Sequence, residues 1–370
     1  MPFRSSLARS AGKLLGVFKE RDLSLRGATQ SDRVTVLGLN ATGGTQSGPD
    51  GVGSALEPGN GYKYHMFTTP GSFVVTNGIF PTTIDYLLVA GGGSGGNTPD
   101  SGNYQMAGGG GAGAFRTGQI TTLQPASSYP VVIGTGGLYS GGPQGAGPYP
   151  QTEGWYGGNG LDSSFNAPGG NGVSAITAAG GGSGGGGTND AAGEMGQVGG
   201  SAGGGGGYAT PGPGGVIVAS GDQYPGTGSS FPSPANGWGS DSNTGTDGGG
   251  GGGAGEEGGE HPVTGAAGLP AFNADTGIPP SYGTPGPSAG RWFGGGGGVG
   301  ADGPGIGPFA GGAGGGGAGG VMVARPGTPG TANTGSGGGG AGADNWPSPG
   351  LGTGGNGADG IVIIRYAKYA

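Results

Sequence analysis

The sequence contains no cysteine and only two histidines among its 370 residues. Without cysteine, the chain has no disulfide framework, no thiolate metal site and no cysteine nucleophile. Two histidines leave little material for general acid–base catalysis, so we expect no enzymatic activity, no metal site and no cofactor. Charged residues are also scarce, at 9% of the chain. This low charge argues against simple disorder, because disordered chains usually carry a high net charge.

Apolar side chains are few as well, at 31% of the chain, and glycine takes their place with 110 residues. Glycine is concentrated in eight runs of similar length that recur across most of the chain. These runs span residues 91–96, 108–113, 180–187, 199–207, 248–255, 294–300, 311–320 and 335–342. Both the α-helix and the β-strand disfavour glycine, so neither element is expected in the runs.

The recurrence of the runs favours an ordered packing over a set of flexible linkers. A polyproline II-type helix has no internal hydrogen bonds and rises about 3.1 Å per residue, so its amides and carbonyls point sideways toward neighbouring chains. Only glycine lets such backbones approach closely enough to bond to one another. We therefore predict a bundle of polyglycine II helices, with disorder or silk-like stacking as the alternatives.

Strand-like segments flank the runs and predict a small β-base that carries the bundle. They cover residues 32–40, 62–68, 72–76, 84–90, 119–123, 129–134, 173–177 and 360–366. The last of them, GIVIIRY, is a continuous apolar run of the kind that suits a buried strand, and we expect it to pair near residues 86–90. The predicted fold class is thus mostly β and irregular, with one short helix at the N-terminus.

The N-terminal residues 1–27 differ from the rest of the chain in charge. They hold six basic and two acidic residues, a net charge of +4, which leaves −12 for the remainder of a chain whose total is −8. An acidic body is a poor candidate for binding nucleic acid. We therefore divide the chain into a separate segment 1–27, a short strand and linker at 28–60, and a glycine-rich domain at 61–370.

Residues 5–26 have the apolar spacing of an amphipathic helix. A docking helix for another protein is favoured over a surface helix on its own domain or a membrane or targeting segment. The short apolar stretch 14–18, interrupted by Lys19, does not resemble a secretory signal. The docking candidates are Leu7, Leu14, Leu15, Phe18, Leu25 and Arg21.

Two motifs suggest metal binding, and we expect neither to bind one. Residues 354–362, GGNGADGIV, fit the calcium-binding nonapeptide repeat, and residues 157–165 nearly fit it. Calcium-binding repeats occur as tandem copies, whereas these two lie far apart. Glu256, Glu257 and Glu260 precede His261, but a solvated acidic loop explains that cluster more simply.

Several blocks occur in an order that resembles the glycine-rich domain of tailed-phage tail fibres and tip adhesins. The blocks are YKYHMFTTPGSFVV, DYLLVAGGGSGG, GGGGAGAFRTG, YPVVIGTGG and a closing GADGIVIIRY, and the resemblance covers roughly residues 60–370. It implies packed polyglycine II helices whose connecting loops bind the host surface. The N-terminal GKLLGVFKERDLSLRG looks like an attachment segment of marine-phage tail proteins.

The resemblance implies a virion tail protein that docks by residues 1–27 on other tail proteins and recognises a host glycan or outer-membrane protein, as a homo-oligomer in the particle. The competing hypothesis is a structural virion decoration protein without a receptor. A third is a secreted polyglycine-helix protein with a flat ice- or matrix-binding face, which the basic N-terminal segment disfavours.

Aromatic residues gather between the glycine runs and are the candidate receptor-binding residues. If each run crosses the bundle once, connections alternate between its two ends. Segments 97–107 and 256–293 then fall at the end remote from the β-base, whereas 208–247 falls beside the base. On this argument the receptor-binding candidates are Tyr104, Phe272, Tyr282, Trp292 and Phe293.

Overall fold

The structure is a computed structural model that describes part of the chain. The described residues are 38–77, 83–98, 106–139, 157–187, 196–207, 248–256, 258, 264–301, 308–321, 326–342 and 352–368. The chain divides into two compact units, Met1–Leu37 with Tyr369, and Gly38–Lys368 with Ala370. The first unit lies outside the described residues, and with it the predicted helix and its docking candidates Leu7, Leu14, Leu15, Phe18, Arg21 and Leu25.

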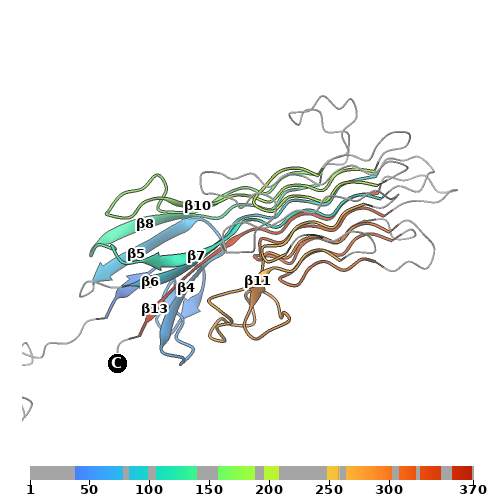
Figure 1. Ribbon diagram of the computed structural model, residues 1–370. Helices are drawn as coiled ribbons and strands as arrows, with labels where there is room; N and C mark the ends of the chain where they lie inside the picture. Colours follow the sequence, from blue (N-terminus) through green and yellow to red (C-terminus); the bar gives the residue numbers. More distant parts are fainter. Residues whose placement is uncertain are drawn as a thin grey trace, which may run out of the picture. The chain divides into compact units, whose positions relative to one another are not determined.

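The described residues form strands and irregular extended chain and contain no helix, which confirms the mostly β and irregular fold class. Accordingly, no helix in this part of the chain is long and apolar enough to cross a membrane. The strands gather at one end of the second unit and the glycine-rich segments run side by side from there (Figure 1).

A four-stranded antiparallel sheet joins the end of the chain to its first half. Its strand order is β4 (Tyr62–Phe67), β13 (Ile361–Ala367), β6 (Ile84–Val89) and β7 (Phe115–Ile120). Within it Ile361 lies opposite Val89 and Ile364 opposite Tyr86, so the predicted pairing of the last strand near residues 86–90 is confirmed.

A second antiparallel sheet has five strands. Their order is β1 (Asn40–Thr42), β5 (Gly71–Asn77), β8 (Ser127–Val132), β9 (Ser163–Phe165) and β10 (Ile176–Ala178). Two short ladders complete the strands, one between β2 (Ser47–Gly48) and β3 (Gly51–Val52), the other between β11 (Leu269–Pro270) and β12 (Trp292–Phe293).

The four-stranded sheet is buried on both faces. On one face, Leu88 and Val362 pack with Phe73 and Tyr129 of the five-stranded sheet. On the other face, a second cluster joins the sheet to the segment 269–293, through residues that include Leu87, Ile361, Ile363, Ala271, Ile278 and Phe293. Successive side chains of a strand point to opposite faces, so burial on both faces requires the continuous apolar run of β13.

The strands expected at 129–134 and 173–177 are β8 and β10, each shifted by one to three residues, and two other segments differ more. A strand was expected at 119–123, but β7 is Phe115–Ile120, because all six of its residues pair with β6. The opening residues of β7 directly continue a glycine run, which hid the strand in the sequence. The segment 41–60, expected to be a linker, folds back on the sheet through Gln46. This buried side chain accepts a bond of 2.9 Å from the Met66 amide and donates to the Gly43 and Ser54 carbonyls.

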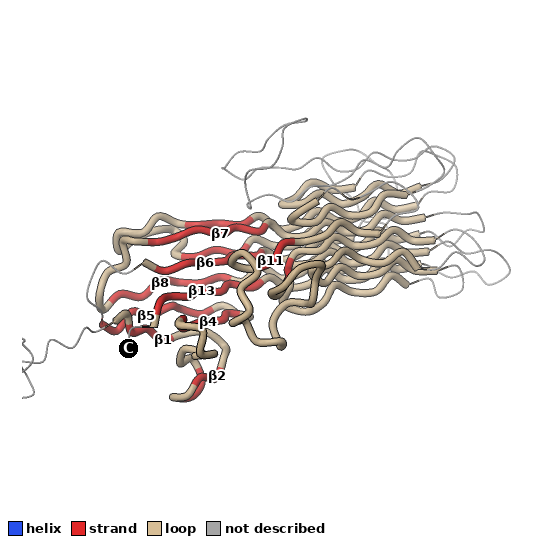
Figure 2. Tube along the Cα trace, turned by 60° about the horizontal axis from the view of Figure 1, so that its bottom comes forward, coloured by secondary structure: helices blue, strands red, loops and turns tan. Residues whose placement is uncertain are grey.

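The glycine runs form extended passes that lie side by side and belong to no sheet (Figure 2). Backbone hydrogen bonds give the direction of each pass relative to the sheets. The passes that leave the sheets are 91–98, 134–139, 179–187, 201–207, 294–301, 316–321 and 335–342. The passes that return are 106–114, 157–162, 196–199, 248–254, 264–268, 308–312, 326–330 and 352–360.

Hydrogen bonding between passes repeats every third residue, as the central pass 106–114 shows. The amides of Ala107, Gly110 and Gly113 donate to Ala341, Gly338 and Gly335 of one neighbouring pass. Those of Gly108, Gly111 and Ala114 donate to Gly185, Gly182 and Ala179 of a second, and those of Gly109 and Ala112 to Gly249 and Gly252 of a third. The amides of this central pass therefore donate to three different neighbouring passes.

Five of these passes were not among the predicted runs: 134–139, 157–162, 264–268, 326–330 and 352–360. They mix glycine with larger residues because only the positions that face a neighbour must lack a side chain. In the first of them, a Cβ on Gly137 would lie 1.9 Å from the Gly158 carbonyl oxygen, whereas the next residue, Leu138, is 68% exposed.

The predicted alternation of connections is wrong, because several runs reverse direction within the glycine itself. Run 311–320 turns back at Gly314 and Gly315, whose φ angles of 101° and 105° belong to the left-handed region that favours glycine. Runs 199–207 and 248–255 also contain reversals. As a result, the segment 269–293 packs against the four-stranded sheet, while residues 207 and 248 stand at the opposite end of the passes.

Candidate functional site

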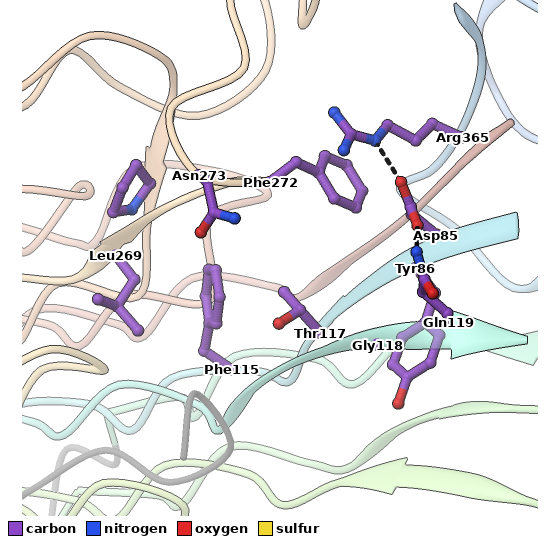
Figure 3. Close-up of a pocket in the computed structure, with 11 residues that line it drawn as sticks. Asp85, Tyr86, Phe115, Thr117, Gly118, Gln119, Leu269, Phe272, Asn273 and Arg365 are labelled. Carbon is purple, nitrogen blue, oxygen red and sulfur yellow. Dashed lines mark hydrogen bonds and ion pairs between the residues drawn. The ribbon is translucent and has the colours of Figure 1, made fainter. Parts of the chain in front are cut away.

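A pocket of about 390 Å³ opens between the β6–β7 edge of the four-stranded sheet and the segment 269–273 (Figure 3). Its apolar lining comes from Phe115, Leu269, Pro270 and Phe272. The polar lining comes from Asp85, Thr117, Gln119, Asn273 and Arg365. The volume of this pocket lies within the range of small-molecule sites, and its lining is more polar than is common for them.

Arg365 of β13 fixes one wall of this pocket. Its Nε donates to Asp85 at 2.8 Å, and its Nη1 donates to Asp275. The guanidinium carbon also lies 4.3 Å from the ring centroid of Phe272 and 4.5 Å from that of Tyr62. Asp85 and Tyr62 thus fix the guanidinium from within the sheet, and Asp275 and Phe272 attach the segment to it.

Asp275 is the other half of this attachment. Burial favours the neutral acid, but hydrogen bonds from the Tyr64 hydroxyl, the Gly277 amide and Arg365 outweigh it, so the pKa of Asp275 is lowered. Burial together with the hydrogen bond to Asp275 raises the pKa of Tyr64 to about 12. Asp275 is therefore ionised and Tyr64 is a neutral donor at physiological pH.

The pocket wall contains a strained turn. Phe272, Asn273 and Ala274 have φ angles of 46°, 55° and 66°, so three consecutive residues with side chains adopt the left-handed conformation. Each such residue costs roughly 1–2 kcal/mol relative to an ordinary conformation. Strain of this kind persists only where the surroundings hold it in place, and it is common at binding sites. Here Phe272 and Asn273 both line the pocket.

The predicted receptor-binding residues lie mainly beside this pocket rather than at the remote end of the passes. Phe293 is fully buried against the sheet, where it supports the segment and presents no surface to a receptor. Phe272 and Tyr282 pack on the same cluster and are partly exposed, as is Trp292. Tyr104 lies outside the described residues.

The pocket residues Asp85, Thr117, Asn273 and Arg365 were missed from the sequence. They come from segments far apart in the chain, and no spacing connects them. The available signal was limited to single polar residues inside apolar strands, such as Arg365 directly after IVII.

The two nonapeptide-like motifs bridge neighbouring passes through their side chains. Asn159 and Asp162 accept hydrogen bonds from the Ser183 and Gly180 amides, at 2.8 and 2.9 Å. Asn356 and Asp359 accept from the Tyr139 and Gly136 amides, at 2.9 and 2.7 Å. The spacing of three puts both side chains on one side of a three-residue repeat. Each oxygen thus takes the place of a backbone carbonyl.

Among the described residues, no group of three or more His, Asp or Glu side chains could hold a metal ion. Glu256 is described, whereas Glu257, Glu260 and His261 lie outside the described residues.

Comparison with known proteins gives a family for the chain. A family model described as a glycine-rich domain matches residues 68–277, which include β6 and β7 of the four-stranded sheet, most of the five-stranded sheet and the passes from 91–98 to 264–268. No curated protein matches the sequence. Since the family model covers more than half of the 370 residues, this chain belongs to the glycine-rich domain family.

Proposed function

We propose that the protein is a tail fibre or tip adhesin of a tailed phage, and that its glycine passes are polyglycine II helices. The hydrogen bonds that repeat every third residue carry this proposal. A polyglycine II helix has three residues per turn, so consecutive residues point to three different neighbours. This pattern is absent from β-ladders, in which residues alternate between two sides.

A bundle bonded in this way suits an adhesin, because it satisfies the backbone groups of a glycine-rich chain without a large apolar core. Every described pass shares hydrogen bonds with its neighbours, so bending one pass would break bonds to the others. A rigid support limits the ordering entropy that is lost when a receptor binds. The sheets would orient the bundle on the virion, and residues 1–27 would dock on other tail proteins within a homo-oligomer.

The host partner in this proposal is a surface glycan or an outer-membrane protein, and no covalent chemistry is involved. The test is adsorption competition with purified protein. We expect an excess of soluble protein to slow adsorption of the phage to its host, because both compete for one receptor. Normal adsorption at saturating protein would instead favour a structural decoration protein without a receptor.

The attachment half of the proposal has its own test. Deletion of residues 1–27 should leave the unit 38–368 folded, with an unchanged melting temperature, but should remove the protein from purified particles. A matched deletion of residues 41–60 is the control, because that segment packs on the sheet through Gln46 and its loss should lower the melting temperature. Particles that still incorporate the 28–370 chain would refute docking by residues 1–27.

A further inference from the structure

We propose that the pocket between β6, β7 and the segment 269–273 binds one ring of an uncharged sugar. The inference rests on the proposed adhesin function and deepens it, since it names the class of ligand and the site. It places the contact beside the sheets and not at the remote end of the passes.

The apolar wall that contains Phe272 suits a sugar ring. Phe272 is partly exposed and lines the pocket, whereas Phe115 is 2% exposed and contributes only to the buried base of the pocket (Figure 3). The face of an aromatic ring carries partial negative charge, which attracts the weakly positive C–H groups on the face of a sugar ring. Leu269 and Pro270 extend the apolar lining. A ligand with an apolar face and polar edges would match this wall.

Polar groups without protein partners converge on the same space. The Asn273 amide and the Thr117 hydroxyl line the pocket, and within the described chain neither side chain makes a hydrogen bond. An amide offers both donors and an acceptor, and a hydroxyl offers one of each. This combination fits sugar hydroxyls, which also donate and accept.

The charge balance favours an uncharged ligand. Among the described residues that line the pocket, Arg365 is the one cation, and Asp85 and Asp275 both pair with it. Two carboxylates against one guanidinium leave the site slightly negative, so it would repel sulfated or acidic sugars. A cationic ligand would have no unpaired carboxylate to bind, because both carboxylates accept further hydrogen bonds. Asp85 accepts from Gln119 at 2.9 Å, and Asp275 accepts from Tyr64 and Gly277.

The pocket wall is also preorganised. The left-handed turn covers Phe272 to Ala274, and Asp275 follows it directly in the sequence. The hydrogen bond from Arg365 to Asp275 holds the turn in place. The free-energy cost of the strained turn is therefore incurred during folding and not on binding. Because the turn is already ordered, less conformational entropy is lost when a ligand binds.

The experiment uses the full chain and a panel of methyl glycosides of neutral hexoses and N-acetylhexosamines, with saturation-transfer NMR to detect binding. We expect at least one neutral glycoside to bind with a dissociation constant on the order of 1 mM. Asn273→Gly and Thr117→Val should each weaken it by about three- to tenfold, since each removes one hydrogen-bonding group. Glycine suits the left-handed position, so N273G keeps the fold.

Two matched variants serve as controls. Asn333→Gly alters another left-handed asparagine, with φ of 56°, and Thr177→Val alters a threonine on β10; neither residue lines the pocket. Both should bind like the wild type. Equal effects of the pocket and control variants, no binding across the neutral panel, or tighter binding of a uronic acid glycoside would overturn the proposal.

The outcome is separable from that of the adhesin proposal. Sugar binding without competition for adsorption would leave the pocket assigned and the adhesin function rejected. Competition for adsorption without sugar binding would reject the pocket and leave the adhesin function in place.

Discussion

The Nη1 group of Arg365 donates to the carboxylate of Asp275, a residue that precedes it by 90 positions. The bond joins the last strand of the four-stranded sheet to the segment that forms the pocket wall. The side chains of Arg365 and Asp275 are 16% and 8% exposed, so the pair is largely removed from water. Together with the hydrogen bond from Tyr64 of β4 to Asp275, this bond connects the stability of the β-base to the geometry of the candidate site.

Replacing Asp275 with alanine should destabilise the protein by about 2–3 kcal/mol in urea denaturation. Removing one partner of a buried ion pair usually costs about 3–5 kcal/mol. The cost is expected to be smaller here because Arg365 remains paired with Asp85. Asp275→Asn should cost less, because its amide oxygen can still accept from Tyr64. The exposed Asp50→Ala is the control. Equal stability of D275A and D50A would show that the attachment contributes nothing.

Replacing Gly251 with alanine should destabilise the bundle by about 3 kcal/mol, since overpacking at this level forces the backbone to shift. A Cβ at this position would lie 1.9 Å from the carbonyl oxygen of Gly110, in the central pass. Denaturant unfolding of the purified protein measures the effect.

Gly71→Ala is the matched control, since a Cβ there would meet no atom nearer than 3.6 Å. It should be neutral or slightly stabilising, by about 0.5–1 kcal/mol, because alanine is less costly than glycine in a strand. A G251A protein as stable as G71A would contradict the close packing of the passes.

The sequence was most informative where burial leaves a pattern. The first four residues of β13, IVII, are all apolar because both faces of the strand are covered there, and this run predicted a buried strand and its neighbour β6. The reversals inside the glycine runs left no such mark. Gly314 and Gly315 turn the chain while their neighbours continue straight, and nothing distinguishes them in a run of glycines. If a single reversal is missed, the predicted direction of every later pass is inverted.

The pocket could not be predicted for a different reason. Thr117 faces it because β7 starts at Phe115, and Asn273 faces it because a strained turn precedes Asp275. Both positions depend on the pairing of distant segments. Phe272 was chosen as an aromatic residue of a loop, and it does line the pocket, although the argument that placed it remote from the sheets was wrong.

Replacing Asp359 with alanine should cost about 1–3 kcal/mol, because the buried amide of Gly136 loses the oxygen that now lies 2.7 Å away. Asp359→Asn keeps an oxygen at that position and should retain most of the stability. Melting temperatures in calcium and in chelator should agree for all three proteins. A chelator-sensitive wild type, made insensitive by D359N, would instead support a calcium site.

Stability should fall as the pH drops from about 6.5 to about 4, because of His65. The side chain is fully buried, its Nδ1 lies 2.7 Å from the Gly43 carbonyl oxygen, and its ring stacks on Tyr366. Burial lowers its pKa from 6.5 to about 4, although the Gly43 bond partly opposes the shift. Between these two values the unfolded chain takes up a proton that the folded chain excludes, so acid favours unfolding.

A pKa shift of this size corresponds to about 3 kcal/mol of the free energy of unfolding, at about 1.4 kcal/mol per unit of pKa. This contribution is fully present above pH 6.5 and lost by about pH 4.

His65→Gln should abolish the slope in this window, at some cost in stability at pH 7. His261→Gln is the control, because it removes the other histidine and should leave the slope intact. Urea titrations at half-unit steps of pH measure both. A slope that survives in H65Q and vanishes in H261Q would show that the pH dependence comes from His261, and the prediction for His65 would be wrong. Loss below pH 4 would instead reflect Asp275 and Glu57, two carboxylates whose lowered pKa values place their contribution there.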